Sequence, residues 1–409
     1  MFDRYQGIVL KLSPQSLGFT FLLAALAAFP PLSTDLYLSV LSVIGQSLGT
    51  SPEAAGYTVS VFLGSFALSQ LVFGPLSDRY GRRPIGLLGC ALYSVTAFGC
   101  ARSSSLSELL VWRCLSGMGA GAASVLAFAI VRDLFSGVAG RVRFAYVSAT
   151  QALAPMFAPV LGSLLYRFTG WRSLFILLGA AGVLVTAAFG LCFEESLPQE
   201  RRATLALRDM LSNYRHILVN RQAVACCLLN ALSMGSLLAY ITGSSFVFVD
   251  LLGAPRTEYG GILLLTASGA MIGSWMSGRL NRAFVAPNNI LIAGLTLVFT
   301  AAGTMLLLSL WGRFTTMTAV PLSLAMTISI GLVTPNVANS MLAPLAKMAG
   351  AASALFGCVG MLGGAFSSAV IASIPSKSAV PLTVVMTMCS ALALTTFFVL
   401  YRPRRLEEA

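Results

Sequence analysis

The stretch GPLSDRYGRRPI, residues 74–85, lies between two long apolar runs and decides the fold. Its glycines and charged residues are Gly74, Asp78, Arg79, Gly81, Arg82 and Arg83. The two glycines permit a tight reversal of the chain, because glycine has no Cβ atom. The three arginines predict that the turn lies on the cytoplasmic side of a membrane, where basic residues are enriched. The aspartate among them is a candidate for an ion pair between helices. The alternative is a generic basic loop.

The composition of the chain is that of a polytopic membrane protein. Of its 409 residues, 57% are hydrophobic and 10% are charged, whereas soluble domains average about 25% charged residues. The net charge of +12 would suggest a nucleic-acid partner in a soluble protein. Here the distribution of the charge accounts for it, so no nucleic-acid partner is expected. The N-terminus shows no convincing cleavable signal peptide, and the first apolar run is expected to stay as a span.

The sequence gives no sign of an enzyme or of a metal site. The eight cysteines fall in or at the ends of apolar runs, without the spacing of metal ligands. They are expected to pack between helices as small apolar residues. A phosphate-binding Gly-x-x-x-x-Gly-Lys-Ser/Thr loop does not occur, which argues against an ATP-driven pump. Since nothing resembles a catalytic triad, we predict no enzyme, no metal and no cofactor.

Twelve apolar runs come close to the roughly 20 residues that a membrane-spanning helix needs. Lipid offers no hydrogen bonds to the backbone, and the runs lack the alternation of barrel strands, so helices are expected. The predicted spans are 17–42, 54–76, 84–101, 106–131, 143–166, 171–193, 222–249, 258–280, 288–310, 317–340, 348–374 and 379–401.

The distribution of basic residues tests this count and predicts the orientation. With both termini in the cytoplasm, 19 lysines and arginines lie on the inner side and 6 on the outer side. Because basic residues concentrate in cytoplasmic loops, this split favours twelve spans with both termini inside.

The longest polar stretch, residues 194–221, divides the chain into two sets of six spans. We predict an N-terminal bundle over 1–193, a cytoplasmic linker with an amphipathic helix over 194–221, and a C-terminal bundle over 222–409. Gly278-Arg279-Leu280-Asn281-Arg282 follows the eighth span as a degraded copy of the turn after the second span. The expected fold class is therefore an all-α membrane protein of twelve helices in two six-helix bundles.

Two opposite charges lie inside predicted spans. Asp35 is the only acid well inside a span, and Arg113 is the only base. Each lies about seven residues from the outer end of its span, which places both roughly 10 Å deep at the helical rise. Buried charges are costly and need partners, so we expect them to pair. The hypothesis is that Asp35 binds the coupling proton and that its neutralisation weakens its hold on Arg113. The alternative is a static structural ion pair.

Further residues point to bends and to a polar path. The fifth span contains Pro155, Pro159 and Gly162, which predict a bend in the helix with close packing. The alternative is a bend without a functional role. Asp133, at the inner end of the fourth span, is either a partner of Arg82 or Arg79 or a solvated charge. Candidates to line a substrate cavity are the polar and aromatic residues at mid-span, namely Tyr37, Phe62, Phe66, Gln70, Gln151, Asn230, Tyr240 and Asn336. We expect no buried charge in the second half.

The stretch at 74–85 resembles the loop signature of the major facilitator superfamily of secondary transporters. In that superfamily, an acid at the inner end of the fourth span, where Asp133 lies here, pairs with an arginine of the signature. The fifth span is similar to the antiporter signature, with alanine in place of the glycine before each proline. Four further motifs resemble the Bcr/CflA-type drug:proton antiporters: STDLYL at 33–38, AYITGSSFVF at 239–248, GLVTPN at 331–336 and AGAASALFG at 349–357.

This resemblance covers essentially the whole chain. It implies a proton-coupled exporter of drugs or small molecules in the bacterial inner membrane that works by alternating access with a proton gradient as its energy source. Family substrates are bicyclomycin, phenicols, sulfonamides and some amino-acid-like or peptide-like compounds. The expected partners are a small-molecule substrate, protons and membrane lipid, with the chain as a monomer. The alternative is a metabolite or siderophore-like transporter of different direction or coupling.

Overall fold

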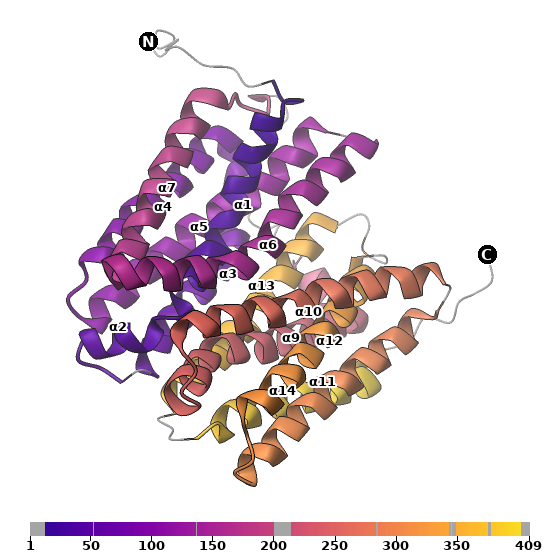
Figure 1. Ribbon diagram of the computed structural model, residues 1–409. Coiled ribbons are helices and arrows are strands. Elements are labelled where there is room, and N and C mark those ends of the chain that lie inside the picture. The colour runs from indigo at the N-terminus through magenta and orange to yellow at the C-terminus, as the bar shows by residue number, and fades with distance from the viewer. Residues whose placement is uncertain are drawn as a thin grey trace. The chain divides into compact units, whose positions relative to one another are not determined.

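The computed structural model describes residues 13–51, 53–135, 137–199, 214–283, 285–342, 345, 349–374 and 378–401. The chain divides into two compact units (Figure 1). Unit 1 contains residues 1–37 and 64–205, and unit 2 contains residues 38–63 and 206–409. These units differ from the predicted division in two places: segment 38–63 belongs to unit 2, and the predicted linker 194–221 is divided between the two units.

The regular elements of the described residues are all helices. In the first half these are α1 (Leu17–Leu38), α2 (Leu41–Ser47), the 3₁₀ turn η1 (Ala54–Gly56), α3 (Tyr57–Tyr80), α4 (Arg82–Arg102), α5 (Leu106–Leu134), α6 (Gly137–Thr169) and α7 (Trp171–Cys192). In the second half they are α9 (Arg221–Ser245), the π-helical turn η3 (Phe246–Leu251), α10 (Arg256–Arg282), α11 (Pro287–Leu310), α12 (Thr316–Leu342), α13 (Ala349–Ser373) and α14 (Val380–Leu400).

Each of the twelve predicted spans corresponds to one of these helices. Eleven helices in the described part of the chain are long and apolar enough to cross a membrane. The remaining predicted span, 143–166, falls inside α6, a helix of 33 residues. The all-α fold class is therefore confirmed.

Three predicted details are wrong at the ends of helices. The first span was expected to run to residue 42, but α1 ends at Leu38 because the backbone of Val40 leaves the helical region, with φ −120° and ψ 13°. The seventh span, predicted to end at residue 249, continues to Leu251, with its last turn formed by the π-helical turn η3. The reversal expected at Gly74 does not occur, since α3 continues through Pro75 to Tyr80 and only Gly81 turns the chain, with φ +100°.

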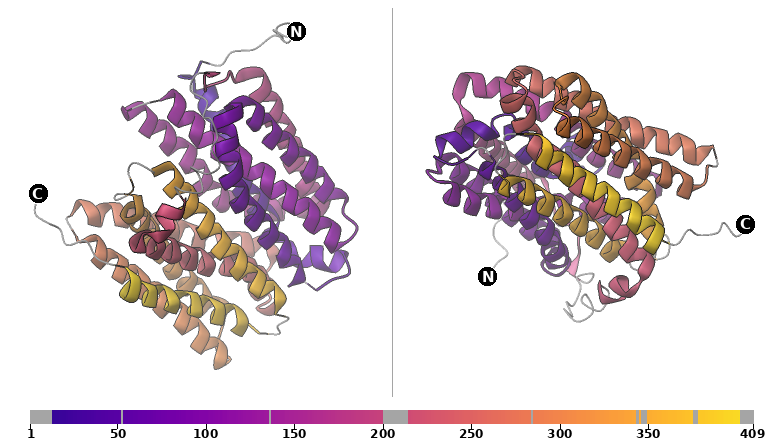
Figure 2. Two further views of the ribbon diagram at one scale, coloured as in Figure 1. Left: turned by 180° about the vertical axis from the view of Figure 1, so that it is seen from behind. Right: turned by 90° about the horizontal axis from the view of Figure 1, so that it is seen from below.

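Unit 1 is held together by close backbone packing of α4 against α5 and α7 (Figures 1 and 2). A Cβ atom on Gly119 of α5 would lie 2.6 Å from the backbone nitrogen of Tyr93 in α4. This is the close approach that small residues allow between helices in lipid. The ring of Tyr93 stacks on Phe29 of α1 at 4.2 Å, and its hydroxyl shares a hydrogen bond of 2.5 Å with Ser33.

Unit 2 is built on α9, which packs along α13 and α14, and on α12, which packs along α10 and α11. One apolar cluster includes Ile217, Leu291 and Phe397, with Tyr214 packed against it. The predicted amphipathic helix of the linker falls mostly outside the described residues, but 214–219 are helical. The apolar side of this helical end therefore covers the core of unit 2.

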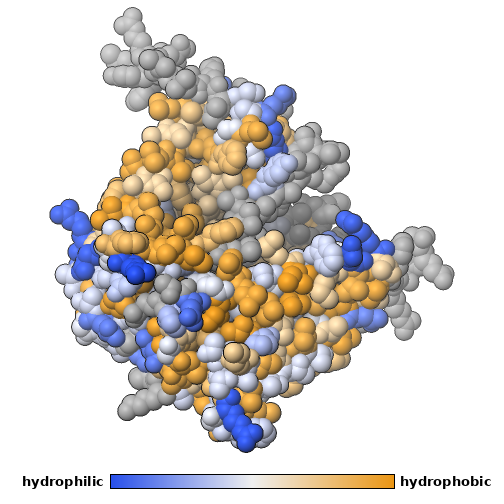
Figure 3. Space-filling view, in the orientation of Figure 1, coloured by the Kyte–Doolittle hydropathy of each residue, from blue (hydrophilic) through white to orange (hydrophobic). Residues whose placement is uncertain are grey.

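The faces turned away from these cores are apolar as well. In the space-filling view, hydrophobic side chains cover much of the visible surface of each unit (Figure 3). Large exposed side chains include Phe21, Phe168, Leu184, Trp311 and Phe398. A soluble protein rarely exposes contiguous apolar patches of this extent, so these faces suit contact with lipid.

Candidate functional site

Asp35 is buried near the C-terminal end of α1, with 6% of its surface exposed. Its Oδ1 accepts a hydrogen bond of 3.1 Å from the hydroxyl of Thr34. The same hydroxyl also lies 3.2 Å from the carbonyl oxygen of Pro30 and 3.1 Å from that of Pro31. A hydroxyl has one proton, so it cannot satisfy three acceptors at once. The carboxylate is therefore weakly solvated by the protein around it.

Arg113 lies in α5 within a cradle of aromatic rings. Its guanidinium carbon is 4.9 Å from the centre of the Tyr37 ring and 5.9 Å from that of Phe175. The two rings lie 5.3 Å apart, so α1, α5 and α7 all contribute to the cradle. A guanidinium over an aromatic face is attracted by the ring quadrupole, and more strongly where water is excluded.

The structure does not join Asp35 and Arg113 in an ion pair. Within the described part of the chain, the carboxylate contacts Thr34 and the guanidinium contacts aromatic rings. Because α1 ends at Leu38, Asp35 is three residues from the end of its helix, whereas Arg113 is seven residues from the start of α5. Counted from these helix ends, the positions of Asp35 and Arg113 differ by four residues, so the equal spacing expected from the sequence does not hold.

Gly162 brings α6 against α1 beside Asp35. A Cβ atom at this position would overlap the carbonyl oxygen of Leu36 and lie 2.7 Å from its carbonyl carbon. Pro159 is buried one turn earlier, whereas the side chains of Pro155 and Gln151 lie outside the described residues. Only a residue without a Cβ atom allows this crossing of the two helices.

Replacing Gly162 with alanine is therefore expected to lower the free energy of unfolding by about 1–3 kcal/mol, because the backbone of α1 must move away from the added methyl group. Thermal unfolding of the purified protein in detergent measures the effect. Gly303→Ala in α11 is the matched control, since a Cβ atom there would have nothing within 4 Å. If both variants unfolded at the wild-type temperature, the close crossing would have no structural importance.

Arg82 is the centre of a charged cluster where the ends of α3, α4 and α5 meet. Its Nε lies 2.8 Å from Asp133 Oδ2, and its guanidinium reaches Asp78 Oδ1 and Ser77 Oγ, each at 2.5 Å. Of the two partners predicted for Asp133, the structure thus selects Arg82. Arg79 is exposed and instead lies over the ring of Tyr80 at 5.2 Å.

Glu195 completes this cluster and was missed in the sequence. Its two carboxylate oxygens accept the backbone N–H groups of Arg82 and Arg83, at 2.8 and 3.1 Å. These are free donors of the first turn of α4, which has no acid of its own and no side-chain cap. The guanidinium of Arg83 donates to the carbonyl oxygen of Gly190, 2.6 Å away. The sequence signal that could have predicted this contact is an acid directly after a span together with a helix start that has no acid or cap of its own.

A neutral cluster occupies the corresponding place in unit 2. The amide nitrogen of Asn336 donates to Ser277 Oγ at 2.7 Å, and its amide oxygen accepts a bond of 3.1 Å from Asn281. Asn281 belongs to the degraded copy of the signature turn. The copy therefore keeps a polar connection, here between α10 and α12, and this connection is made by amides and a hydroxyl instead of charged groups.

The other predicted cavity residues are mostly engaged in packing. Phe62, Phe66 and Tyr240 are buried, and Gln70 is half-buried. The Tyr240 hydroxyl donates to Thr266 at 3.2 Å, and the Asn230 amide donates to the carbonyl oxygen of Phe356 at 2.9 Å. Their part in a substrate path stays a prediction.

Buried charge is unevenly distributed among the described residues. The charged side chains that are fully or nearly fully buried there are Asp35, Arg82 and Arg113, all in unit 1. The buried polar side chains of unit 2 are serines, threonines and asparagines. This agrees with the prediction that the second half has no buried charge, within the described ranges.

The sequence matches the family described as Major Facilitator Superfamily over residues 17–368. It is similar to the bicyclomycin resistance protein homolog of Haemophilus influenzae, with 26% identity over 392 residues that cover 93% of this chain and 96% of the relative. It is also similar to the multidrug resistance protein MdtL of Klebsiella pneumoniae, with 30% identity over 382 residues that cover 93% and 95%.

Solved structures agree in fold. A bacterial homolog of the human lysosomal transporter Spinster, in an inward-facing and occupied conformation, has a TM-score of 0.72 at 17% identity, over 97% of this chain and 100% of that one. A peptide transporter, POT, also has a TM-score of 0.72, at 14% identity, over 94% and 93% of the chains. At these identities the likeness concerns the fold alone.

Proposed function

Since the chain belongs to the major facilitator superfamily of transporters, we propose that it is a proton-coupled exporter of small, mainly apolar compounds that works by alternating access. The family and the relatives consist of transporters rather than enzymes. Relatives named for resistance to bicyclomycin and to multiple drugs support export as the direction.

The observation that carries proton coupling is the buried carboxylate of Asp35. An ionised carboxylate in a low-dielectric interior is costly unless it is paired or well hydrogen-bonded. The single shared bond from Thr34 compensates little of that cost. Binding a proton removes the charge, so the protonation state of Asp35 changes the stability of the surrounding packing. An exporter can use this difference to favour one of two conformations.

Arg113 acts in this proposal through its cradle rather than through a permanent ion pair. Tyr37 lies two residues after Asp35 in α1, and the guanidinium of Arg113 packs against the Tyr37 ring. A shift of α1 on protonation of Asp35 moves Tyr37 and so alters the contact with Arg113. Direct pairing of Asp35 with Arg113 then belongs to the other conformation of the cycle. A static structural role is the competing explanation.

The charged cluster around Arg82 has a gating role in the proposal. It fixes the ends of α3, α4 and α5 through one buried guanidinium, with the carboxylates of Asp78 and Asp133 as partners. Clusters of this kind have discrete formed and broken states, so they suit a conformational equilibrium. We further propose that the protein is a monomer of the bacterial inner membrane, with both termini in the cytoplasm and no cofactor beside the proton gradient.

Everted membrane vesicles test the direction and the coupling. In these vesicles the cytoplasmic face is outside, so an imposed proton gradient should be dissipated when a transported compound is added to the medium. A panel of bicyclomycin, phenicols and sulfonamides is the first choice of compounds. Accumulation of a compound without any effect on the gradient would favour the second candidate, a transporter of other coupling. Right-side-out vesicles that import a metabolite would favour uptake.

A further inference from the structure

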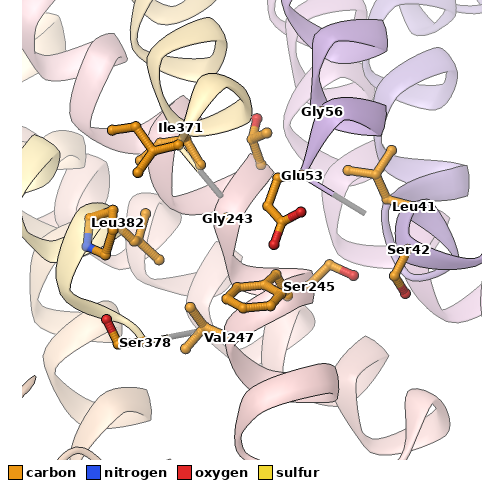
Figure 4. A pocket seen from close by; sticks show the side chains of 14 residues that line it. Leu41, Ser42, Glu53, Gly56, Gly243, Ser245, Val247, Ile371, Ser378 and Leu382 are labelled. Carbon is orange, nitrogen blue, oxygen red and sulfur yellow. The ribbon is translucent and has the colours of Figure 1, made fainter. Parts of the chain in front are cut away.

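A cavity of about 40 Å³ lies within unit 2, where α2 and η1 pack on α9 and on the start of α14. A cavity needs at least about 10–15 Å³ to hold one water molecule, so this one has room for a small ion with bound water. Its walls carry the apolar side chains of Leu41, Phe246 and Leu382 and the oxygens of Ser42, Glu53 and Ser245 (Figure 4). By the predicted topology the cavity is on the outer side of the membrane.

Two of these oxygens are buried hydroxyls. Ser42 in α2 is 3% exposed and Ser245 at the end of α9 is 2% exposed. Neither Oγ atom has a hydrogen-bond partner in the described part of the chain. A buried polar group without a partner costs free energy, and native proteins normally satisfy such groups with protein, water or an ion. Both residues are among those that line this cavity, so a water molecule or an ion bound there would satisfy them.

The third oxygen donor is a carboxylate. Glu53, at the start of η1, extends its side chain into the cavity (Figure 4). Among the described residues that line the cavity, none is a lysine or an arginine. The lining thus combines one negative charge with two hydroxyl oxygens.

We propose that Glu53, Ser42 and Ser245 bind a sodium ion in this cavity. Carboxylate and hydroxyl oxygens are ligands for hard cations. A single carboxylate balances one positive charge, whereas sites for calcium commonly take several carboxylates among six to eight oxygens. The small volume excludes a large organic cation, and the carboxylate of Glu53 would repel an anion.

The ion would join segments that are distant in the sequence. Glu53 and Ser42 belong to the segment 38–63, and Ser245 belongs to α9. Beside the cavity, Ser60 Oγ donates to Ser368 Oγ at 2.9 Å, and Ser368 shares a hydrogen bond of 2.7 Å with Thr242. Because a ligand that binds one arrangement stabilises it by mass action, sodium is expected to stabilise this packing of 38–63 within unit 2.

The test uses the full-length protein in detergent, at constant ionic strength set with N-methylglucamine chloride. Sodium is expected to raise the unfolding temperature in a saturable way and to be retained as radiolabelled sodium in an equilibrium binding assay. Glu53→Gln keeps the shape of the side chain but removes the charge, so it should weaken sodium binding by at least about tenfold. Ser245→Ala and Ser42→Ala should weaken binding less, and each removes one ligand without removing the charge.

Glu258→Gln is the matched control, because Glu258 is an exposed acid in the first turn of α10 and does not line the cavity. It should bind sodium like the wild type. Equal sodium binding by wild type and all three cavity variants would overturn the proposal. So would stabilisation by methylammonium, with none by sodium. Asp35→Asn should retain sodium binding, so the failure of the export proposal and the failure of this one are distinguishable.

Discussion

Replacement of Asp35 with asparagine is expected to abolish proton-driven transport and to leave folded protein in the membrane. Asparagine has nearly the same shape and can still accept the hydrogen bond from Thr34. It cannot take up and release a proton, so the two protonation states that drive the cycle no longer exist. Because a buried charge has also been removed, the free energy of unfolding should stay equal or rise. The assay is substrate-induced dissipation of a proton gradient in everted vesicles.

Asp250→Asn is the control for this variant, since Asp250 is an exposed acid in the π-helical turn η3. It should transport like the wild type. Asp35→Asn should still move substrate down its own concentration gradient. This measurement distinguishes a loss of proton coupling from a loss of the substrate path. Uphill transport at the wild-type rate by Asp35→Asn would refute the assignment of the proton to this carboxylate.

Replacement of Arg82 with methionine is expected to give the largest loss of stability, about 3–5 kcal/mol, because it leaves partly buried carboxylates without their cation. Asp133 loses its 2.8 Å contact, and Ser77 loses a donor. Methionine retains much of the apolar stem of arginine, so the loss reports the charge rather than a cavity. Thermal and denaturant unfolding in detergent measure the change.

Arg79→Met is the matched control, because Arg79 belongs to the same signature turn but is exposed. Its effect on unfolding should remain within about 0.5 kcal/mol. The double variant Arg82→Met with Asp133→Leu should recover part of the loss, since an apolar pair can replace a buried ion pair. A single Arg82→Met variant as stable as Arg79→Met would mean that the cluster does not contribute to the free energy of unfolding.

The helices could be predicted from the sequence because lipid imposes a simple rule on the backbone. Every apolar run of sufficient length became a helix, and the start of α4 at Arg82 followed from the glycine before it. The break after Leu38 was not predictable from hydropathy, since α2 continues the apolar run. The turn expected at Gly74 was wrong for a related reason: a glycine is compatible with a helix, and nothing local forces a turn there.

The partners of site residues were harder to predict than their burial. Asp35 and Arg113 are both buried as expected, yet a position counted along each helix does not determine which helix faces meet. The contact of Asp133 was predictable from the signature, whereas Glu195 reaches Arg82 across 113 positions of sequence. Such a contact depends on how α7 packs on α4, which periodicity does not encode.

The uneven burial of charge in the described residues has an electrical consequence. A membrane potential does work only on charges that move through it, about 2.3 kcal/mol for each elementary charge across 100 mV. The most deeply buried ionic groups, Asp35, Arg82 and Arg113, belong to unit 1, and the polar interior of unit 2 is neutral where it is described. We therefore expect the part of any voltage dependence that comes from fully buried side chains to originate in unit 1.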